Sequence, residues 1–182
     1  KLAALPKGRS VEEWLELFRT NISIFNDLST LQLREVLLDS TVHSFAPGEA
    51  VFIRNEPGSS MFAIAQGRVL VEVNPNDASI TVPIPEGSIF GEVGLISGRP
   101  RGSTVRAEGQ VVAVELSRTA ALKLIATVPS VGRAVARISI ERQLLQMFGS
   151  GLNPADVAPM VDAAEVVEVR AGKKVVEEGA DD

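Results

Sequence analysis

The chain has 182 residues, 45% of them hydrophobic and 23% charged, which is the balance of a globular protein and not of a disordered one. Its 18 basic and 23 acidic residues leave a net charge of −5, and this argues against nucleic-acid binding, because neutralising phosphates needs a surplus of lysine and arginine. The chain has no cysteine and a single histidine, His43, which excludes disulfides and thiolate metal sites, and we expect no metal or cofactor.

No apolar run approaches the roughly 20 residues that a membrane-spanning helix needs. No secretory leader opens the sequence, which begins without Met and ends at Asp182. We therefore expect a soluble, cytoplasmic piece of a longer protein, with no membrane contact in this piece.

Two helices are predicted before the first strand, and residues 1–19 are interpreted as a linker with the leading helix. Ser10 and Glu13 have the spacing of a capping box, and a second helix is predicted from about Ser29 to Asp39. Apolar contacts are expected from Trp14 and Phe18 in the first helix and from Leu31, Val36, Leu37 and Leu38 in the second.

Between Thr41 and about Leu116 the sequence breaks into short apolar stretches separated by glycine, proline and asparagine. Stretches spaced by roughly 8–12 residues indicate a sandwich, roll or barrel, and not the alternating strands and helices of a parallel sheet. The predicted strands are 42–45, 51–53, 62–64, 69–73, 80–82, 104–107 and 111–116.

Helical spacing returns after Leu116. Ser117 is the predicted N-terminal cap of a helix that runs through about Thr127. Because proline is disfavoured inside a helix and favoured at its first turn, Pro129 is predicted to start a longer helix that runs to about Phe148.

Residues 149–182 are interpreted as the start of a second, truncated repeat. A shift of 124 residues places Gly172 on Gly48, and a helix followed by strands at Glu165–Arg170 and Lys173–Glu177 repeats the earlier order. A segment this short cannot bury a core of its own, so we expect it to pack on the first domain, pair with a neighbour or stay loose.

The stretch around Gly91 holds the densest group of special residues. Gly91 and Gly94 allow backbone amides to approach a ligand, and a short helical turn that starts there directs N–H groups outward, which suits an anion. Arg101, ten residues after Gly91, carries a planar fork that matches a phosphate. Glu92 fits such a site if the ligand also has a hydroxyl group, and a structural ion pair with Arg101 is the alternative.

Two runs carry a resemblance to a known family: Phe90-Gly91-Glu92-Val93-Gly94-Leu95 and Pro100-Arg101-Gly102-Ser103-Thr104-Val105-Arg106-Ala107. They resemble the phosphate-binding cassette of cyclic-nucleotide-binding domains, which occur in catabolite-activator transcription factors, regulatory subunits of cyclic-AMP-dependent kinase and cyclic-nucleotide-gated channels. The resemblance covers about residues 20–148. It implies a mainly β fold with flanking helices, an eight-stranded β-roll of the double-stranded β-helix, jelly-roll-like kind.

The resemblance also implies roles for the matching positions. Glu92 accepts a hydrogen bond from the ribose 2′-hydroxyl, helped by the Gly91 backbone, and Arg101 pairs with the charge of the cyclic phosphate. The other members of the expected cradle are Val93, Gly94, Gly102 and Ser103. On the last helix the family reaches the base at the positions of Arg142 and Gln146, which are four residues apart and share a face.

Gly102 departs from the family, in which many members have Ala, Ser or Thr at this position. Threonine there is associated with a preference for cyclic GMP (cGMP), so its absence favours cyclic AMP (cAMP). No DNA-binding helix pair follows the last helix, and we expect no direct nucleic-acid binding in this piece.

These observations predict a non-catalytic regulatory module that binds a cyclic mononucleotide, cAMP more than cGMP, and couples binding to movement of the C-terminal helices and an attached domain. An enzyme is not expected, because one histidine is too few for a metal-dependent phosphodiesterase. The alternative is a ligand-free scaffold of the same fold, in which the C-terminal helix or the truncated repeat mediates a homodimer.

Overall fold

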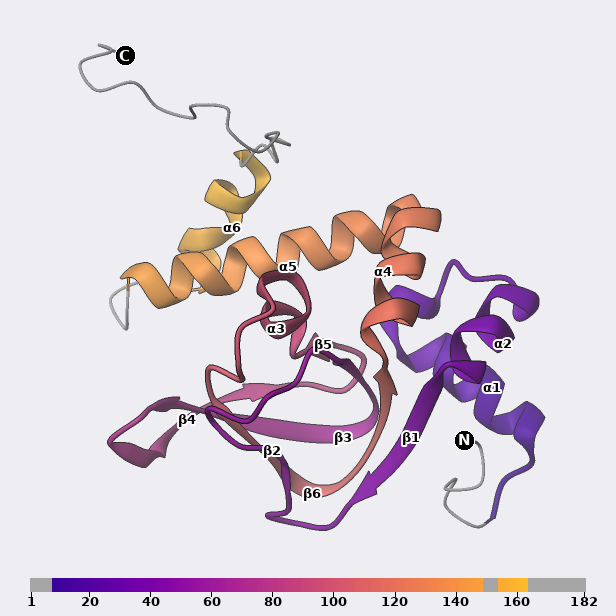
Figure 1. Ribbon diagram of the computed structural model, residues 1–182, viewed down its shortest axis with the longest axis horizontal. Coiled ribbons are helices and arrows are strands. Elements are labelled where there is room, and N and C mark those ends of the chain that lie inside the picture. The colour runs from indigo at the N-terminus through magenta and orange to yellow at the C-terminus, as the bar shows by residue number, and fades with distance from the viewer. Residues whose placement is uncertain (1–7, 149–153, 164–182) are drawn as a thin grey trace. The chain divides into compact units, whose positions relative to one another are not determined.

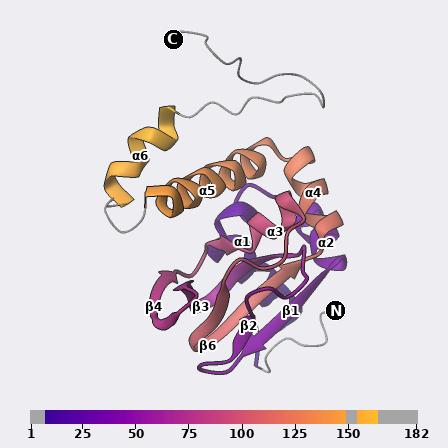
Figure 2. The same cartoon turned by 60° about the vertical axis from the view of Figure 1, so that its left-hand side comes forward.

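The computed structural model describes residues 8–148 and 154–163, divided between a first unit that ends at Val135 and a second that begins at Ala136. The first unit holds an antiparallel sheet, and the first helices of the chain lie beside β1 (Ser40–Phe45) in both views (Figures 1 and 2). The predicted fold class, mainly β with flanking helices, is confirmed.

Three helical elements open the first unit: α1 (Val11–Asn21), the 3₁₀ turn η2 (Ser23–Phe25) and α2 (Thr30–Leu38). Ser10 caps α1 and Ser29 caps α2, each within a complete capping box. Both predicted helix starts are therefore confirmed. The sequence analysis did not predict η2, which is too short to produce a periodic signal.

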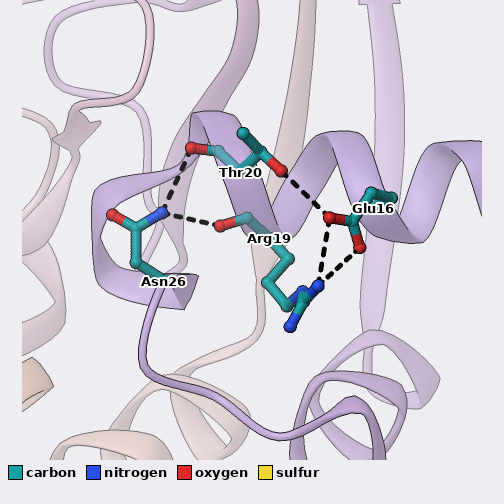
Figure 3. Close-up of polar contacts among 4 residues, drawn as sticks. All are labelled: Glu16, Arg19, Thr20 and Asn26. Atoms are coloured by element: carbon teal, nitrogen blue, oxygen red, sulfur yellow. Dashed lines mark hydrogen bonds and ion pairs between the residues drawn. The ribbon is translucent and has the colours of Figure 1, made fainter.

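Asn26 bonds the last carbonyl groups of α1 (Figure 3). Its Nδ2 donates to the oxygen of Arg19 at 2.7 Å and to that of Thr20 at 3.1 Å, two of the carbonyls that have no partner within the helix. The Arg19 guanidinium bonds both oxygens of Glu16, at 2.7 and 3.0 Å. That ion pair is exposed and adds little stability, so the Asn26 cap is the stronger reason that the helix ends here.

Every strand pairing in the first unit is antiparallel, in the order β1-β6-β3-β4, with β2 joined to β6 and β5 joined to β3. The strands after β1 are β2 (Ala50–Phe52), β3 (Met61–Asn74), β4 (Asp77–Ile84), β5 (Ile89–Phe90) and β6 (Thr104–Leu116).

The resemblance implied eight strands, whereas the described residues form six. The predicted breaks at Gly67 and Gly109 are wrong, because β3 and β6 each continue through their glycine as one long strand with register shifts. Both glycines have positive φ, 85° and 81°, so they bend a strand without ending it. The short strand β5 was not predicted.

One cluster of buried apolar side chains fills the interior of the sheet. Three phenylalanine rings are central to it: those of Phe62 and Phe90 stack with centroids 5.2 Å apart, and Phe52 packs against both at 5.8 Å. The remaining members of the cluster and its partly buried neighbours are Phe45, Val51, Ile64, Val69, Val71, Ile84, Val105, Ala107, Val111 and Ala113.

β4 is the outermost strand beside β3. Ile80 and Val82 on this strand are 46% and 50% exposed. Pro83 stands in the same strand, opposite Leu70 of β3. Because proline has no N–H to donate, it fits a ladder only where that group would point away from the neighbouring strand.

The trailing helices follow the sequence prediction. α4 (Arg118–Thr127) is capped by Ser117, whose hydroxyl accepts from the Ala120 amide, and α5 (Pro129–Phe148) starts at Pro129. Both helix starts are confirmed. The predicted glycine-rich end of α5 lies outside the described residues.

Of the four residues predicted to make apolar contacts in α2, Leu37 is buried and Val36 is half-buried, and the buried Leu33 was not predicted. Leu33 and Leu37 are 2% and 5% exposed, whereas Leu31 and Leu38 are 69% and 79% exposed. The buried pair is four residues apart and so shares one helix face, and α2 contacts α1, α4 and β1. The expectation of apolar contacts from Leu31 and Leu38 is wrong.

The second unit contains the part of α5 after Val135 and α6 (Pro154–Ala163). Arg137 on α5 and Asp162 on α6 form an ion pair at 2.5 Å. The 124-residue shift carries α2 onto positions that α6 occupies, but the predicted strands Glu165–Arg170 and Lys173–Glu177 lie outside the described residues. The truncated repeat stays a prediction.

Candidate functional site

A six-residue helix, α3 (Glu92–Ser97), forms where the sequence predicted a short helical turn. Gly91 precedes it with φ 82°, and Gly98 ends it with φ 67°. An L-residue with a side chain rarely adopts this left-handed backbone, so the two glycines set the start and the end of α3. Glu92, the first residue of the helix, is 1% exposed.

The Arg101 side chain is folded against the start of β3 and of α3, and the residue is only 5% exposed. Its Nη1 donates to the carbonyl oxygen of Ser60 at 2.9 Å and to that of Gly91 at 3.2 Å. Its Nη2 donates to Ser60 Oγ at 2.9 Å. The guanidinium is therefore fixed in direction before any ligand is considered.

Aromatic and glycine residues surround the guanidinium. Its central carbon lies 4.3 Å from the centroid of the Phe52 ring and 5.7 Å from that of Phe62, which are cation–π distances. A Cβ on Gly58 would lie 2.9 Å from Arg101 Nε and 3.2 Å from the central carbon, so Gly58 must lack a side chain for Arg101 to fit here.

Two cassette glycines are also closely packed. A Cβ on Gly91 would lie 2.8 Å from Arg101 Nη1, and one on Gly94 would lie 2.8 Å from the Gly58 carbonyl oxygen. Gly58 and Gly91 thus leave room for the Arg101 side chain, and Gly94 leaves room for the backbone at Gly58. The sequence analysis identified Gly91 and Gly94, and it missed Gly58.

The backbone of Arg101 is held as firmly as its side chain. Its amide donates to the carbonyl oxygen of Glu56 at 2.9 Å, and its carbonyl oxygen accepts from the amide of Asn55 at 2.8 Å. Asn55 has φ 68°, and asparagine is one of the few residues that tolerate this conformation. The turn before β3 is thereby joined to the segment between α3 and β6.

Burial lowers the pKa of the Arg101 guanidinium, and the carboxylates of Glu115, Glu56 and Glu92 oppose that effect. Arginine starts from a value so high that it stays charged in proteins. The site therefore contains a buried cation whose charge is stabilised by three surrounding carboxylates.

One edge of the guanidinium remains available. Nη1 donates two hydrogen bonds, to Ser60 and to Gly91, and Nη2 donates one, to Ser60. Within the residues that the structure describes, Nε–H and the second Nη2–H of Arg101 have no hydrogen-bond partner. These two N–H groups form the parallel pair with which arginine binds two oxygens of a phosphate.

Residues 42–128 match the cyclic nucleotide-binding domain family. They form a cyclic nucleotide-binding domain. Such domains are regulatory, and the predicted family is confirmed.

Relatives and solved structures agree with this result. The chain is 32% identical over 120 residues to the cAMP-dependent protein kinase regulatory subunit of Dictyostelium discoideum, covering 63% of this chain and 35% of that protein. It is 29% identical over 137 residues to a cyclic nucleotide-gated potassium channel of Mesorhizobium japonicum, covering 75% of this chain and 37% of that protein. The structure of a cAMP-binding acyltransferase from Mycobacterium smegmatis superimposes with a TM-score of 0.61 at 25% identity, covering 75% of this chain and 42% of the other.

The chain spans 28% and 10% of the length of two further relatives, so each of these proteins is much longer than the matched part. Among the helices of residues 8–148 and 154–163, none is both long and apolar enough to cross a membrane. In the same residues no group of three or more histidine, aspartate or glutamate side chains is placed to hold a metal ion.

Four of the predicted cassette positions lie in the cyclic nucleotide-binding domain, and the two predicted base contacts lie further along the chain, in the second unit. Val93 and Gly102 are exposed, Ser103 is half-buried, and Gly94 is buried. Arg142 and Gln146 lie on the part of α5 that belongs to the second unit, and the side chain of Gln146 is outside the described part of the chain. Their approach to the base stays a prediction.

Ser60 and Phe52 are further contacts of Arg101 that sequence reasoning missed. Ser60 lies 41 positions before Arg101, and nothing in either local pattern links the two. His43 hydrogen-bonds Glu115, and Arg106 pairs with Glu72 on the surface of the sheet.

Proposed function

We propose that this domain binds a cyclic purine mononucleotide, cAMP in preference to cGMP, with Arg101 holding the phosphate. The observation that carries the proposal is the pair of N–H donors on Arg101, Nε–H and the second Nη2–H, left without a partner by the described residues. The other donors and the Phe52 ring fix the cation in direction, so little side-chain freedom remains to be lost when an anion binds.

Glu92 is the proposed acceptor for the ribose 2′-hydroxyl, together with the Gly91 backbone. Its place supports this role, since it starts α3 directly after Gly91 and is held in a buried position beside Arg101. The other proposed contacts are Val93, Gly94, Gly102 and Ser103 in the cassette and Arg142 and Gln146 toward the base.

A contact between α3 and α4 supports coupling to the trailing helices. Arg118 at the start of α4 donates from Nη1 to the carbonyl oxygen of Leu95 at 2.5 Å. Leu95 lies on α3 and is fully buried. A ligand that moves α3 therefore acts directly on the first residue of α4. Such coupling requires unequal affinity for the two arrangements of the helices.

Calorimetric titration with cAMP and with cGMP tests the proposed function, together with thermal melts in the presence and absence of each. A ligand that binds the folded domain alone raises its melting temperature by mass action. We expect heat of binding and a higher melting temperature with cAMP, and a smaller effect with cGMP at the same concentration. No heat and no shift with either ligand would overturn the proposal.

A ligand-free scaffold is the second candidate, favoured by the packing around Arg101. Ser60, Gly91 and Phe52 already contact the Arg101 guanidinium within the protein. A cavity of about 40 Å³ lies between α2 and α4, and one of about 120 Å³ lies between α1 and α2, both away from the cassette. The proposed partner is then a second copy, joined through the C-terminal helix or the truncated repeat. In either case we propose that the domain works in the cytoplasm.

The preference for cAMP makes Gly102 a position to test. A Cβ on Gly102 would meet no atom within 4 Å, so a side chain fits there without strain. Guanine carries an exocyclic amino group that adenine lacks. Gly102→Thr supplies an acceptor for it, and we expect the affinity for cGMP to rise about tenfold, the size of one added hydrogen bond.

Gly102→Val is the matched control, because valine has the shape of threonine without the hydroxyl. We expect this variant to leave the cGMP affinity unchanged, and both variants to change the cAMP affinity by less than about twofold. Competition titrations against a fluorescent cyclic nucleotide measure all of these values. Equal gains for both variants would mean that packing, and not the hydroxyl, sets the preference.

A further inference from the structure

Behind Arg101, a chain of hydrogen bonds runs from the residue before β3 to β6 and β1, and reaches the only histidine of the protein. Arg101 Nη2 lies 2.9 Å from Ser60 Oγ, Ser60 Oγ lies 2.6 Å from Glu115 Oε1, and Glu115 Oε2 lies 2.7 Å from His43 Nε2. We call these four residues the relay. None of the cassette positions other than Arg101 belongs to it.

Strand register explains why the relay forms. Glu115 of β6 pairs with Thr41 of β1 on one side and with Phe62 of β3 on the other. His43 is two residues from Thr41 on β1, so its side chain lies on the same face of the sheet as Glu115, and Ser60 directly precedes β3, two residues before Phe62. The carboxylate thus contacts His43 of β1 on one side and Ser60, at the start of β3, on the other.

The direction of each hydrogen bond follows from the chemistry of the groups. Arginine only donates, so Ser60 Oγ accepts from Arg101. The Ser60 hydroxyl must then donate its own proton to the Glu115 carboxylate, which only accepts when ionised. His43 meets the second carboxylate oxygen. The hydrogen bonds thus form one continuous path from His43 through Glu115 and Ser60 to the guanidinium.

Among the residues that the structure describes, few other charges lie near this chain of hydrogen bonds. The His43 ring packs against the rings of Phe45 and Phe62, with centroids 5.6 and 6.2 Å away, and Glu115 is its ion-pair partner. Around Arg101 the charged groups are Glu115, Glu56 and Glu92, of which Glu115 acts most strongly. The His43 and Glu115 side chains are 34% and 31% exposed, so protons from solvent reach the pair.

We propose that Glu115 and His43 are positioning residues for Arg101, and that protonation of His43 strengthens the binding of an anionic ligand at this cation. With His43 neutral, the negative charge of Glu115 offsets part of the positive charge that Arg101 presents to the ligand, and it strengthens the hydrogen bond from Ser60 to Glu115. When His43 is protonated, its positive charge balances that of Glu115, and both effects become weaker. This inference rests on the proposed function, since it needs a ligand that Arg101 binds.

Calorimetric titration of the 182-residue chain with cAMP between about pH 8 and about pH 5.5 tests the relay, because histidine is the side chain that titrates in this interval. We expect wild-type affinity to rise about threefold on acidification, the size expected of one charge acting through partly solvated protein. His43→Gln should bind at the weaker level at every pH. Glu115→Gln should bind at the tighter level at every pH.

Opposite shifts in the two variants distinguish the relay from simple damage to the fold, which would weaken binding in both. Glu108→Gln is the matched control, because Glu108 is a carboxylate on the same strand that pairs with Arg68 and not with the relay. It should keep the wild-type pH dependence. Titrations near neutral pH in two buffers of different ionisation enthalpy should show proton uptake on cAMP binding in the wild type and none in His43→Gln.

Two outcomes overturn the inference in different ways. If the wild type binds cAMP and His43→Gln keeps the same pH dependence and proton uptake, the relay has no role although the proposed function stands. If the wild type binds neither cAMP nor cGMP at any pH, the proposed function fails and the inference fails with it.

Discussion

Arg101→Ala is expected to weaken cAMP binding by about a hundredfold or more, because two hydrogen bonds to a charged group are each worth about 1.5–3 kcal/mol. The loss should fall on ligands that carry the cyclic phosphate, since the substituted group binds no other part of the ligand in our proposal. Calorimetry and displacement of a fluorescent cyclic nucleotide measure it. Equal affinities of the wild type and Arg101→Ala would remove Arg101 from the site.

Arg106→Ala is the matched control for that substitution. Arg106 lies five positions further along the chain, on the exposed surface of β6, and its guanidinium pairs with Glu72. We expect binding to stay within about twofold, because an exposed ion pair contributes little. Arg101→Lys keeps the charge and loses the planar fork, so it should bind at an intermediate level. It also keeps the test decisive if Arg101→Ala fails to fold.

Gly67→Ala is expected to destabilise the folded domain strongly. A Cβ at this position would lie 2.4 Å from the carbonyl oxygen of Gln110, and the φ of 85° is unfavourable for alanine. The left-handed backbone alone costs about 1–2 kcal/mol, and the clash raises the total above about 3 kcal/mol. Thermal melts should show a fall of roughly 10 °C.

Gly109→Ala separates the two causes. Its φ of 81° is nearly the same as that of Gly67, but a Cβ there would meet no atom within 4 Å. We expect this variant to lose only the backbone contribution of about 1–2 kcal/mol. Similar melting temperatures for the two alanine variants would show that the backbone at Gln110 moves away from the new Cβ without loss of stability.

Helix starts were predictable from the sequence because their signals are local. Ser10 with Glu13 and Ser29 with Gln32 bond within one turn, so spacing alone reveals them. Strand ends were less predictable. A glycine in a strand marks either a turn or a bend, and only the pairing partner decides between them. At Gly67 and Gly109 both strands continue, and the β3–β6 pairing resumes after a shift in register.

The cassette was predictable because its residues are contiguous, while the contacts that hold Arg101 were not. Ser60 and Phe52 approach it from segments that local patterns assign only to strands and turns. The same limit applies to α2, where Leu31, Leu33, Leu37 and Leu38 all suit a helix, and only packing against neighbouring elements selects Leu33 and Leu37 for burial.

Pro83 has a consequence for how the protein behaves when it is concentrated. An open sheet margin invites strands of other molecules to add to it, and the apolar side chains of Ile80 and Val82 would favour such growth. Since Pro83 has no N–H to donate on that side, a strand that added to this edge would lack one hydrogen bond at Pro83. Fibre-like self-association through β4 is thereby interrupted after Val82, a form of protection built into the chain itself.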